Sequence, residues 1–542
     1  MASIGSLLNS SRQALNAQST GIKIIGDNIS NVNTPGYTRR RAELVTTQPE
    51  GIGNLQTGTG VAVNVITRIV DGFLTKEVRD RGSDRAQAEV RQEFLSRAEQ
   101  IFSLASSDSG VGFELSRFFS SLEDVAANPS DIALRSQVIE HGESLALTIN
   151  ATYDQLATLQ RESDTRLHSM IDTLNQLTGQ IAEINGEIAK GETSDQQNLT
   201  LRDQRDELIR KLGEILPVQT LDQADRTTMV MLGNGFALVS GSDSRQLDYE
   251  TNPTFAPVGG FQVGLDGSPL GHIVYDYDPN GVGSHADLTS LIRAGGGELG
   301  GLLAVRGTPG AADTSPFDAD GSLVELAAQV ESIARDLLTR FNTEYRGPDE
   351  DTVTANLQPS SFDLNGVSPG VFGLFSYSGA VDDGDGVATN ADLTASGRSS
   401  FANVMSFAVS APRDLAAARD LDPLDASTSF APGDSANIDA MLALRTQNVA
   451  YSLGIFSATT TIEQVYQNAV STVGGSASRA NNDVQLAQAR ESQVQELYNG
   501  TSAVSLDEEF ANLITYQRAF EAAARLVRVG DELLQQVLGI LG

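Results

Sequence analysis

The chain contains no cysteine and no tryptophan among its 542 residues, and only 6% of its residues are aromatic. Without cysteine, the protein forms no disulfide, binds no metal through thiolates and has no thiol nucleophile. The low aromatic content is unusual for a protein that stacks sugars or bases. These absences argue against several classes of enzyme and binding protein, and they leave the cellular compartment open.

Positive charge is scarce as well. Lysine and arginine together number 37 against 70 acidic residues, which gives a formal net charge of −33. A polyanionic partner requires clustered basic residues, so neither nucleic acid nor an acidic membrane surface is expected as a partner. The acidic excess is greatest in residues 221–430, where 29 Asp and Glu stand against 10 Arg and no Lys. This segment is expected to face solvent.

Long hydrophobic runs are also missing. No apolar run approaches the ~20 residues that are needed to span a bilayer. Residues 1–16 contain neither a basic start nor a continuous apolar core, so no cleaved signal peptide is predicted. If the protein leaves the cytoplasm, it is expected to use an export route that recognises a different targeting signal.

Both ends of the chain carry an apolar residue at every seventh position. Such a row forms a narrow stripe along an α-helix, and the stripe is buried by packing against a second one. The predicted assembly interface consists of Leu8, Leu15, Ile22, Ile29, Leu506, Leu513, Phe520, Val527, Leu534 and Leu541. The two stripes can pair within one monomer or pack against neighbouring subunits, and the sequence leaves both arrangements open.

Local signals define several elements between the two stripes. The first helix is expected to end near residue 31, because Pro35 disfavours helical geometry in the residue before it. Pro35 and Gly36 fit the central positions of a type II turn. Alternating valines at 61–65 predict a strand, and the Gly-Asn-Gly sequence at 233–235 predicts a hairpin. Gly530 is expected to interrupt the last helix.

The fold class predicted from these patterns is mainly α with a β-rich insertion. Helical periodicity covers residues 91–216 and resumes from residue 438, whereas the middle is rich in glycine, proline and aspartate, with one helix at 323–341. We expect an elongated multi-domain rod with the N- and C-terminal helices paired as a coiled coil. The predicted domains are a terminal coiled coil (1–60 with 500–542), a long helical bundle (61–220 with 431–499) and an acidic β-rich outer domain (221–430).

Three glycines have the spacing of a dinucleotide-binding loop, G-x-G-x-x-G, at Gly295, Gly297 and Gly300. Such a loop requires a buried strand directly before the glycines and a helix that begins on them. Residues 288–294 include Arg293 and are a poor strand. A glycine-rich turn is therefore the favoured interpretation.

A calcium-binding loop would use hard oxygen ligands at alternating positions. Five residues match its first, third, fifth, sixth and twelfth positions: Asp276, Asp278, Asn280, Gly281 and Asp287. Pro279 within the segment and the strand-like flanks oppose this interpretation. A polar turn is favoured here and in the acidic cluster at 382–385, so neither metal nor cofactor is predicted.

No sequence motif points to catalysis. The four histidines are scattered, and the chain contains no P-loop, no nucleophile elbow and no pair of metal-binding histidines. We therefore expect a structural protein and no enzyme.

Both ends of the chain resemble the axial proteins of the bacterial flagellum, which include rod, hook and hook-associated subunits. The N-terminal resemblance rests on residues 28–39, NISNVNTPGYTR, and the C-terminal one on 504–509, VSLDEE, and 516–517. The matching residues are Asn28, Asn31, Asn33, Thr34, Gly36, Tyr37, Tyr516 and Gln517. Residues 203–206, 296–303 and 362–366 are similar to the hook-associated protein 1 family, and the resemblance is thin in 367–430.

This resemblance implies a structural subunit at the junction between hook and filament, assembled with helical symmetry. The implied partners are further copies of the chain, the hook protein, a second hook-associated junction protein and a cytoplasmic export chaperone that binds the C-terminal helix. The implied location is the extracellular flagellum, reached by type III export without cleavage. The terminal helices are expected to order only on joining neighbours, because most helical stability comes from packing the apolar face.

Two alternatives remain open. The chain can be a flagellar hook protein or another axial subunit, or it can be an acidic calcium-binding surface protein that is secreted. Calorimetric titration with calcium distinguishes the second alternative from an assembly protein.

The stripe at the C-terminal end yields a direct test. We predict that Leu513→Asp or Phe520→Asp abolishes incorporation into flagella while the middle of the chain stays folded, because a charge on the stripe opposes burial. Motility and circular dichroism measure the two effects. A variant that still builds motile flagella contradicts the prediction.

Overall fold

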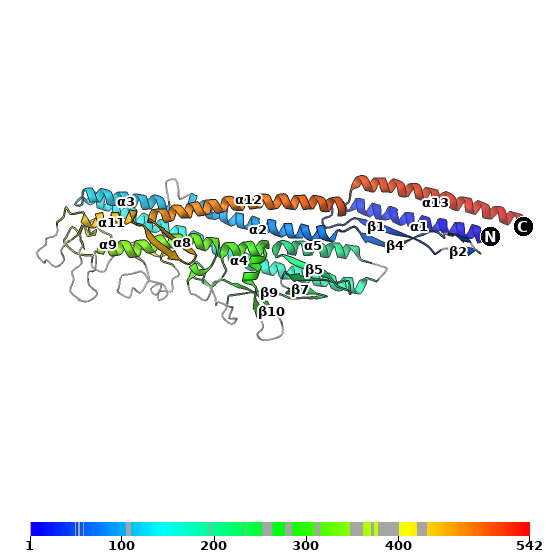
Figure 1. Cartoon of the computed structure of the whole chain (residues 1–542), viewed down its shortest axis with the longest axis horizontal. Helices are drawn as coiled ribbons and strands as arrows, with labels where there is room; N and C mark the ends of the chain where they lie inside the picture. The colour runs from blue at the N-terminus through cyan, green and yellow to red at the C-terminus, as the bar shows by residue number, and fades with distance from the viewer. Residues whose placement is uncertain are drawn as a thin grey trace. The chain divides into compact units, whose positions relative to one another are not determined.

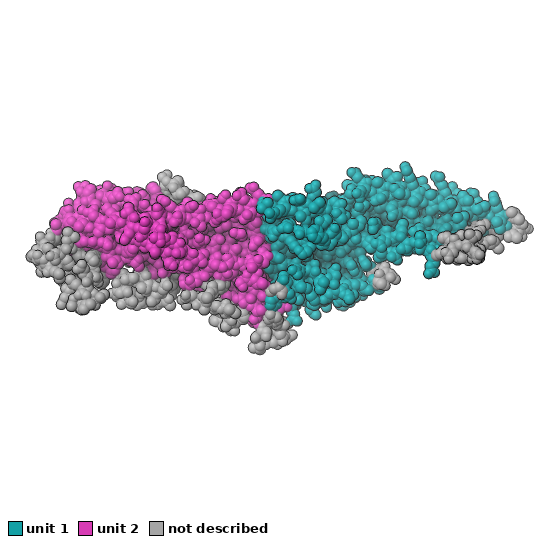
Figure 2. All heavy atoms as spheres, in the orientation of Figure 1, with its two compact units in different colours: residues 1–85, 173–246, 486–542 teal, residues 86–172, 247–485 magenta. Residues whose placement is uncertain are grey.

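The computed structural model describes residues 2–48, 50–52, 55–57, 59–103, 110–193, 197–233, 235–251, 263–276, 285–308, 315–346, 361–369, 373–377, 400–419 and 431–541. The chain forms two compact units (Figure 2). Unit 1 contains Met1–Arg85, Thr173–Gln246 and Leu486–Gly542, and unit 2 contains Ala86–Asp172 and Leu247–Gln485. This division differs from the three predicted domains, whose boundaries stay a prediction.

In unit 1 the two ends of the chain form long helices that lie side by side (Figure 1). Helix α1 spans Ala2–Ser30 and α13 spans Leu506–Leu541. Between them, α1 buries Ala17, Ile24 and Ile25, and α13 buries Ala523. The predicted pairing of the N- and C-terminal helices is therefore confirmed, within a single chain.

Gly530 does not interrupt α13, contrary to the prediction. The helix continues through this residue, and Gly530 is buried against α1. A Cβ atom at Gly530 would lie 2.7 Å from Leu8 Cδ2. The missing side chain thus allows a close approach of two helices, and this packing offsets the low helix propensity of glycine.

A tight turn and a hairpin follow α1. Tyr37 N donates to Thr34 O at 3.2 Å and Gly36 has a φ of 76°, which confirms the type II turn with Pro35 at its second position. Strand β1 (Arg40–Thr46) then pairs antiparallel with β4 (Val61–Arg68), which confirms the predicted valine strand. Both strands contact α1. Strands β2 (Glu50–Ile52) and β3 (Leu55–Thr57) form a second short hairpin.

The rest of unit 1 combines helices with a four-stranded sheet. Its helices are α5 (Leu199–Ile215) and parts of α2 (Gly72–Ser103), α4 (Ile132–Gly191) and α12 (Ile462–Ser502). The sheet has the order β5-β6-β7-β8, formed by Val218–Asp222, Thr228–Leu232, Ala237–Ser240 and Asp243–Ser244. Strands β6 and β7 form the hairpin that was predicted around residues 233–235.

Unit 2 holds the other parts of α2, α4 and α12, together with shorter elements. Its further helices are α3 (Val111–Ala127), α6 (Thr289–Gly295), α7 (Gly297–Arg306), α8 (Ser322–Asp336), a π-helical turn (Leu337–Phe341), α9 (Asn342–Arg346) and α11 (Ala436–Thr446), with 3₁₀ turns at Pro316–Asp318 and Pro412–Asp414. Phenylalanines fill part of the core, where the ring of Phe118 lies 5.9 Å from Phe119 and 5.6 Å from Phe375.

The strands of unit 2 are short. Three of them form the sheet β11-β10-β9, from His285–Asp287, His272–Asp276 and Leu247–Glu250. The pairs β12–β15 and β13–β14 join Ser361–Phe362 to Ala418–Arg419 and Phe375–Tyr377 to Met405–Phe407. The helix predicted at 323–341 is confirmed, and α6 and α7 were missed. The middle is thus a mixed insertion that contains strands.

A second element was missed after α11, where a continuous helical pattern was predicted. Strands β16 (Val449–Leu453) and β17 (Phe456–Thr460) form an antiparallel hairpin before α12 begins. Gly454 turns the chain with a φ of 55°. Val449, Tyr451 and Leu453 alternate with smaller residues, which is the period of a strand, so the sequence did carry a signal for this hairpin.

The glycine motif joins two helices. Helix α6 precedes it, so the strand that a dinucleotide site requires is absent from this position. Gly296 and Gly297 have positive φ values and form the turn that was favoured from the sequence. Gly300 and the adjacent Gly301, which is outside the motif, lie within α7, where a Cβ at Gly300 would lie 3.1 Å from Ile292 O of α6 and one at Gly301 2.9 Å from Gln87 O of α2. The motif therefore serves close helix packing.

We predict that Gly301→Ala lowers the free energy of unfolding by about 1–3 kcal/mol, because the added methyl group must displace the backbone of α2. Thermal unfolding followed by circular dichroism measures the loss. Gly295→Ala is the matched control, since a Cβ there has no atom within 4 Å. Equal melting temperatures for the two variants contradict this account.

Candidate assembly site where the chain ends meet

The signature turn after α1 and the first turn of α13 meet around a buried asparagine. We call Asn28, Tyr37, Arg39, Arg40 and Glu509 the terminal joint. The Nδ2 atom of Asn28 donates to Arg40 O and to Glu509 Oε2, both at 3.0 Å. Its Oδ1 atom accepts from Tyr37 Oη at 2.9 Å and from Arg40 N at 3.0 Å. With 1% of its surface exposed, Asn28 uses all of its hydrogen-bonding positions inside the protein.

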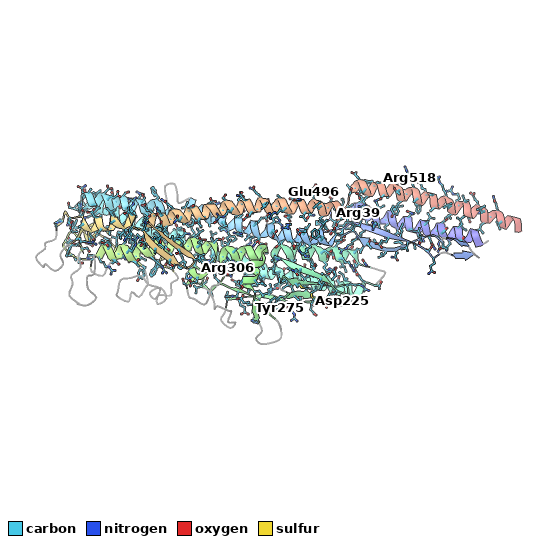
Figure 3. All side chains as sticks on the ribbon, in the orientation of Figure 1. Arg39, Asp225, Tyr275, Arg306, Glu496 and Arg518 are labelled. Atoms are coloured by element: carbon cyan, nitrogen blue, oxygen red, sulfur yellow. The ribbon has the colours of Figure 1, made fainter. Side chains whose placement is uncertain are left out.

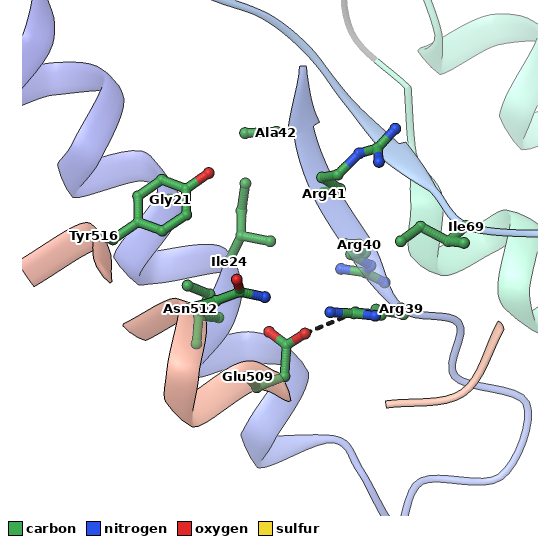
Figure 4. Close-up of a pocket in the computed structure, with 11 residues that line it drawn as sticks. Gly21, Ile24, Arg39, Arg40, Arg41, Ala42, Ile69, Glu509, Asn512 and Tyr516 are labelled. Carbon is green, nitrogen blue, oxygen red and sulfur yellow. Dashed lines mark hydrogen bonds and ion pairs between the residues drawn. The ribbon is translucent and has the colours of Figure 1, made fainter. Parts of the chain in front are cut away.

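Glu509, in the first turn of α13, is held by Arg39 as well as by Asn28. Its side chain is 1% exposed, and its Oε1 atom accepts from Arg39 Nε at 2.7 Å (Figure 4). The Nη1 atom of Arg39 pairs with Glu508 at 2.6 Å, and Arg39 N donates to Ser502 O. One arginine thus holds the start of α13 and the end of α12 beside the signature turn. The carboxylates also lie in the first turn of α13, where the helix dipole favours negative charge.

Tyr37 supplies the remaining side chain of the joint. Burial raises the pKa of Tyr37 to about 12, although the nearby Arg40 guanidinium opposes the shift. The hydroxyl therefore stays protonated at neutral pH and donates to Asn28. The guanidinium carbon of Arg40 lies 4.8 Å from the centre of the Tyr37 ring, a cation–π distance.

Helix α5 extends the network through Asp203. Its carboxylate accepts from Thr38 Oγ1 at 2.5 Å, from Arg40 at 3.1 Å and from Arg68 at 2.9 Å. Arg68 also pairs with Asp206 at 2.8 Å. The segment 203–206, which resembles the hook-associated family, thus fixes the first residues of β1 and the last residue of β4 to α5.

The axial motif residues have different structural roles. Asn31 Nδ2 caps the end of α1 by donating to Asp27 O, and its Oδ1 accepts from Thr34 Oγ1. Gly36 provides the positive φ of the turn, while Asn33 and Gln517 are exposed. Tyr516 covers Gly21, where a Cβ would lie 2.1 Å from its ring.

The predicted stripe residues lie beside this contact. Leu8, Leu15, Ile22, Ile29, Leu513, Val527 and Leu534 are half-buried, Leu506 and Phe520 are 42% and 37% exposed, and the side chain of Leu541 lies outside the described residues. The row that faces α1 most directly is Glu509, Tyr516, Ala523 and Gly530. It also has a spacing of seven, but its composition is mixed, so an apolar pattern could not reveal it.

A small cavity lies at the same place, between α1, β1 and α13 (Figure 4). It is lined by Gly21, Ile24, Ile25, Arg39, Arg40, Arg41, Ala42, Ile69, Glu509, Asn512 and Tyr516. Its one carboxylate, Glu509, is already paired with Arg39. A general acid or base needs a group that can exchange a proton near neutral pH, so this lining suits packing and hydrogen bonding.

The calcium interpretation finds no support in the described residues. Asp278, Asn280 and Gly281 lie outside them, as does the cluster at 382–385. The Asp287 carboxylate accepts from Thr289 N and Oγ1 and is hydrogen-bonded to His272 Nδ1, so it already has three partners within the protein. Among the residues that the structure describes, no group of three or more His, Cys, Asp or Glu is arranged to hold a metal ion.

Helix length and hydropathy give one further observation. In the described part of the chain, every helix is too short or too polar to cross a bilayer.

We predict that Asn28→Ala lowers the free energy of unfolding of unit 1 by about 2–4 kcal/mol, because the Oε2 atom of the buried Glu509 and the Arg40 amide each lose the hydrogen bond to Asn28. Hydrogen exchange of peptides from α1 and α13 measures the loss. Asn33→Ala, in the same motif but exposed, is the matched control and is expected to change stability by less than about 0.5 kcal/mol. Unchanged exchange in Asn28→Ala contradicts the prediction.

Models of flagellar protein families match both ends and the middle of the chain. Residues 95–348 match the flagellar hook-associated protein FlgK helical domain. Residues 8–38 match the flagella basal body rod protein family, and residues 498–540 match the C-terminal region of the flagellar basal body rod FlgEFG proteins. Asn28 and Tyr37 of the terminal joint lie within the first of these two end segments and Glu509 lies within the second, while Arg39 and Arg40 directly follow the first.

Curated relatives match the chain over nearly its full length. Flagellar hook-associated protein 1 of Salmonella typhimurium is 26% identical over 99% of this chain and 100% of its own length. The Bacillus subtilis protein of the same name is 26% identical over 99% of this chain and 98% of its own length. The solved flagellar hook junction protein FlgK of Burkholderia pseudomallei has the same fold, with a TM-score of 0.59 and 15% identity over 79% of this chain and 100% of that protein. The resemblance to the flagellar hook-associated protein 1 family that the sequence indicates is therefore confirmed over 99% of the chain.

Proposed function

We propose that this protein is a structural subunit of the bacterial flagellum at the junction between hook and filament. The observation that carries the proposal is the terminal joint, which ties together two end segments that each match flagellar rod proteins. In an axial subunit both chain ends contribute to the contacts with the neighbouring subunits, so the two terminal helices must keep a fixed alignment with each other. The family is structural, and we propose no catalytic activity.

The chain associates with other axial components of the flagellum. At finer detail, we propose the hook protein on one side, a second hook-associated junction protein on the other, and further copies of this chain beside it. The proposed contacts use the terminal helices, including the predicted stripe residues. Large apolar side chains that remain exposed on α13 in the single chain, such as Phe510 and Ile514, support this assignment.

We further propose that the subunit is exported unfolded through the flagellar type III route, without a cleaved signal peptide, and that a cytoplasmic chaperone covers α13 before export. The absence of cysteine supports export in this form, because no disulfide has to be reduced before the chain unfolds. Coverage of α13 by a chaperone would prevent its exposed apolar residues from associating early.

Loss of the protein is expected to produce hooks without filaments and to release flagellin into the medium, because the filament has no surface on which to start. Electron microscopy of the cells and immunoblotting of the medium measure this, and expression of the full chain from a plasmid is expected to restore filaments. Filaments of normal length on cells without the protein contradict the proposed function.

A further inference from the structure

Two groups of large apolar side chains are exposed on α13. The first group, flank A, consists of Leu506, Phe510 and Ile514, which are 42%, 50% and 51% exposed. The second group, flank B, consists of Leu526, Val529 and Leu533, which are 49%, 48% and 40% exposed. Each flank has three side chains of similar size, and each is large enough to be the centre of a helix–helix contact.

The two flanks lie on opposite sides of the helix. Glu509, Tyr516 and Gly530 mark the direction of α1. At 3.6 residues per turn, flank A lies about 120° from that direction on one side and flank B about 110° on the other. The surface opposite α1 carries the exposed charges of Arg518, Glu521 and Arg525, and Figure 3 shows Arg518 pointing away from α1. Each flank is therefore open to a helix that lies beside the α1–α13 pair.

The flanks are also displaced along the helix. Their central residues, Phe510 and Val529, are separated by 19 positions in one continuous helix. At a rise of 1.5 Å per residue, this separation corresponds to about 29 Å along the axis.

We propose that flank A of one copy of this chain packs against flank B of the next copy, with the two α13 helices parallel and offset by about 29 Å. This inference rests on the proposed function. A head-to-tail assembly requires two different surfaces on opposite sides of each subunit, and the flanks meet this requirement. Successive copies then rise along the helix axis, and the contact repeats around the structure.

An alternative arrangement, in which neighbouring α13 helices lie at the same height, is disfavoured by the exposed charges on α13. In that arrangement flank B would face the exposed Arg528, Asp531 and Glu532 of the next copy. Burial of these charges against leucine and valine costs free energy, because they lose water without gaining a partner. Flank A would face Ala511 and Thr515, which offer little apolar surface. In the offset arrangement, flank A of each copy meets flank B of one neighbour, and its flank B meets flank A of the other neighbour. Both contacts are then apolar.

The absence of cysteine makes this arrangement testable by disulfide trapping. A chain with both Phe510→Cys and Val529→Cys is expressed in place of the native protein, and isolated hooks are oxidised and separated on non-reducing gels. The two cysteines are too far apart to join within one copy, since a disulfide requires Cα atoms within about 7 Å. We expect a ladder of covalent multimers.

The matched control carries Phe510→Cys and Thr515→Cys, which would be joined between copies only if neighbouring helices lay at the same height. We expect no ladder from this control. A ladder from the control, or none from either variant in hooks that contain the chain, overturns the proposed contact. Absence of the native chain from isolated hooks would instead overturn the proposed function.

A second measurement applies if the cysteine variants are not incorporated. Phe510→Ala and Val529→Ala are compared singly and together by counting attached filaments. If the two side chains contact each other between copies, the double variant is expected to be no worse than the more severe single variant. Losses that multiply in the double variant contradict the contact.

Discussion

The hydrogen bond between Asn28 and Glu509 determines how the two ends of this chain meet. Both groups are buried, and leaving either without a partner would cost more free energy than the bond itself contributes. Tyr516 packs on Gly21 and Leu8 packs on Gly530, and these contacts fit the same alignment of the two helices. A buried polar pair selects one alignment, as a single asparagine does in a coiled coil.

The same asparagine also connects the helix pair to the rest of unit 1. Through Tyr37 and Arg40 it fixes the signature turn, and Arg40 and Arg68 in turn bind Asp203 on α5. Arginine suits this role because its planar group bridges several oxygen acceptors at fixed angles. The preference for arginine over lysine in the chain, 33 against 4, is consistent with such bridges, although composition alone did not reveal them.

The sequence predicted the features that depend on local pattern. The terminal helices, the turn at Pro35 and Gly36 and the strand at Val61–Arg68 follow from spacing and backbone preferences, and all three are confirmed. The resemblance of residues 28–39 to axial proteins identified the motif but not the contacts that it makes. Those contacts join Asn28 to Glu509, 481 positions apart, and no local rule relates such distant residues.

Other features were missed because tertiary packing outweighed propensity. Gly530 has a low helix propensity, yet it lies within a continuous helix, where the missing Cβ leaves room for the end of the Leu8 side chain. The most buried row of α13 mixes glutamate, tyrosine, alanine and glycine, so a search for apolar stripes does not find it. The β16–β17 hairpin was overlooked although Val449, Tyr451 and Leu453 alternate, because the helical pattern that resumes at residue 438 was extended across it.

A reconstruction of the intact hook–filament junction by electron cryomicroscopy, at a resolution that shows side chains, tests the central claim most directly. The account predicts that α1 and α13 of the same chain are paired, with the Asn28 amide against the Glu509 carboxylate. A map in which α13 pairs with α1 of a neighbouring subunit, or in which Asn28 faces solvent, would contradict it.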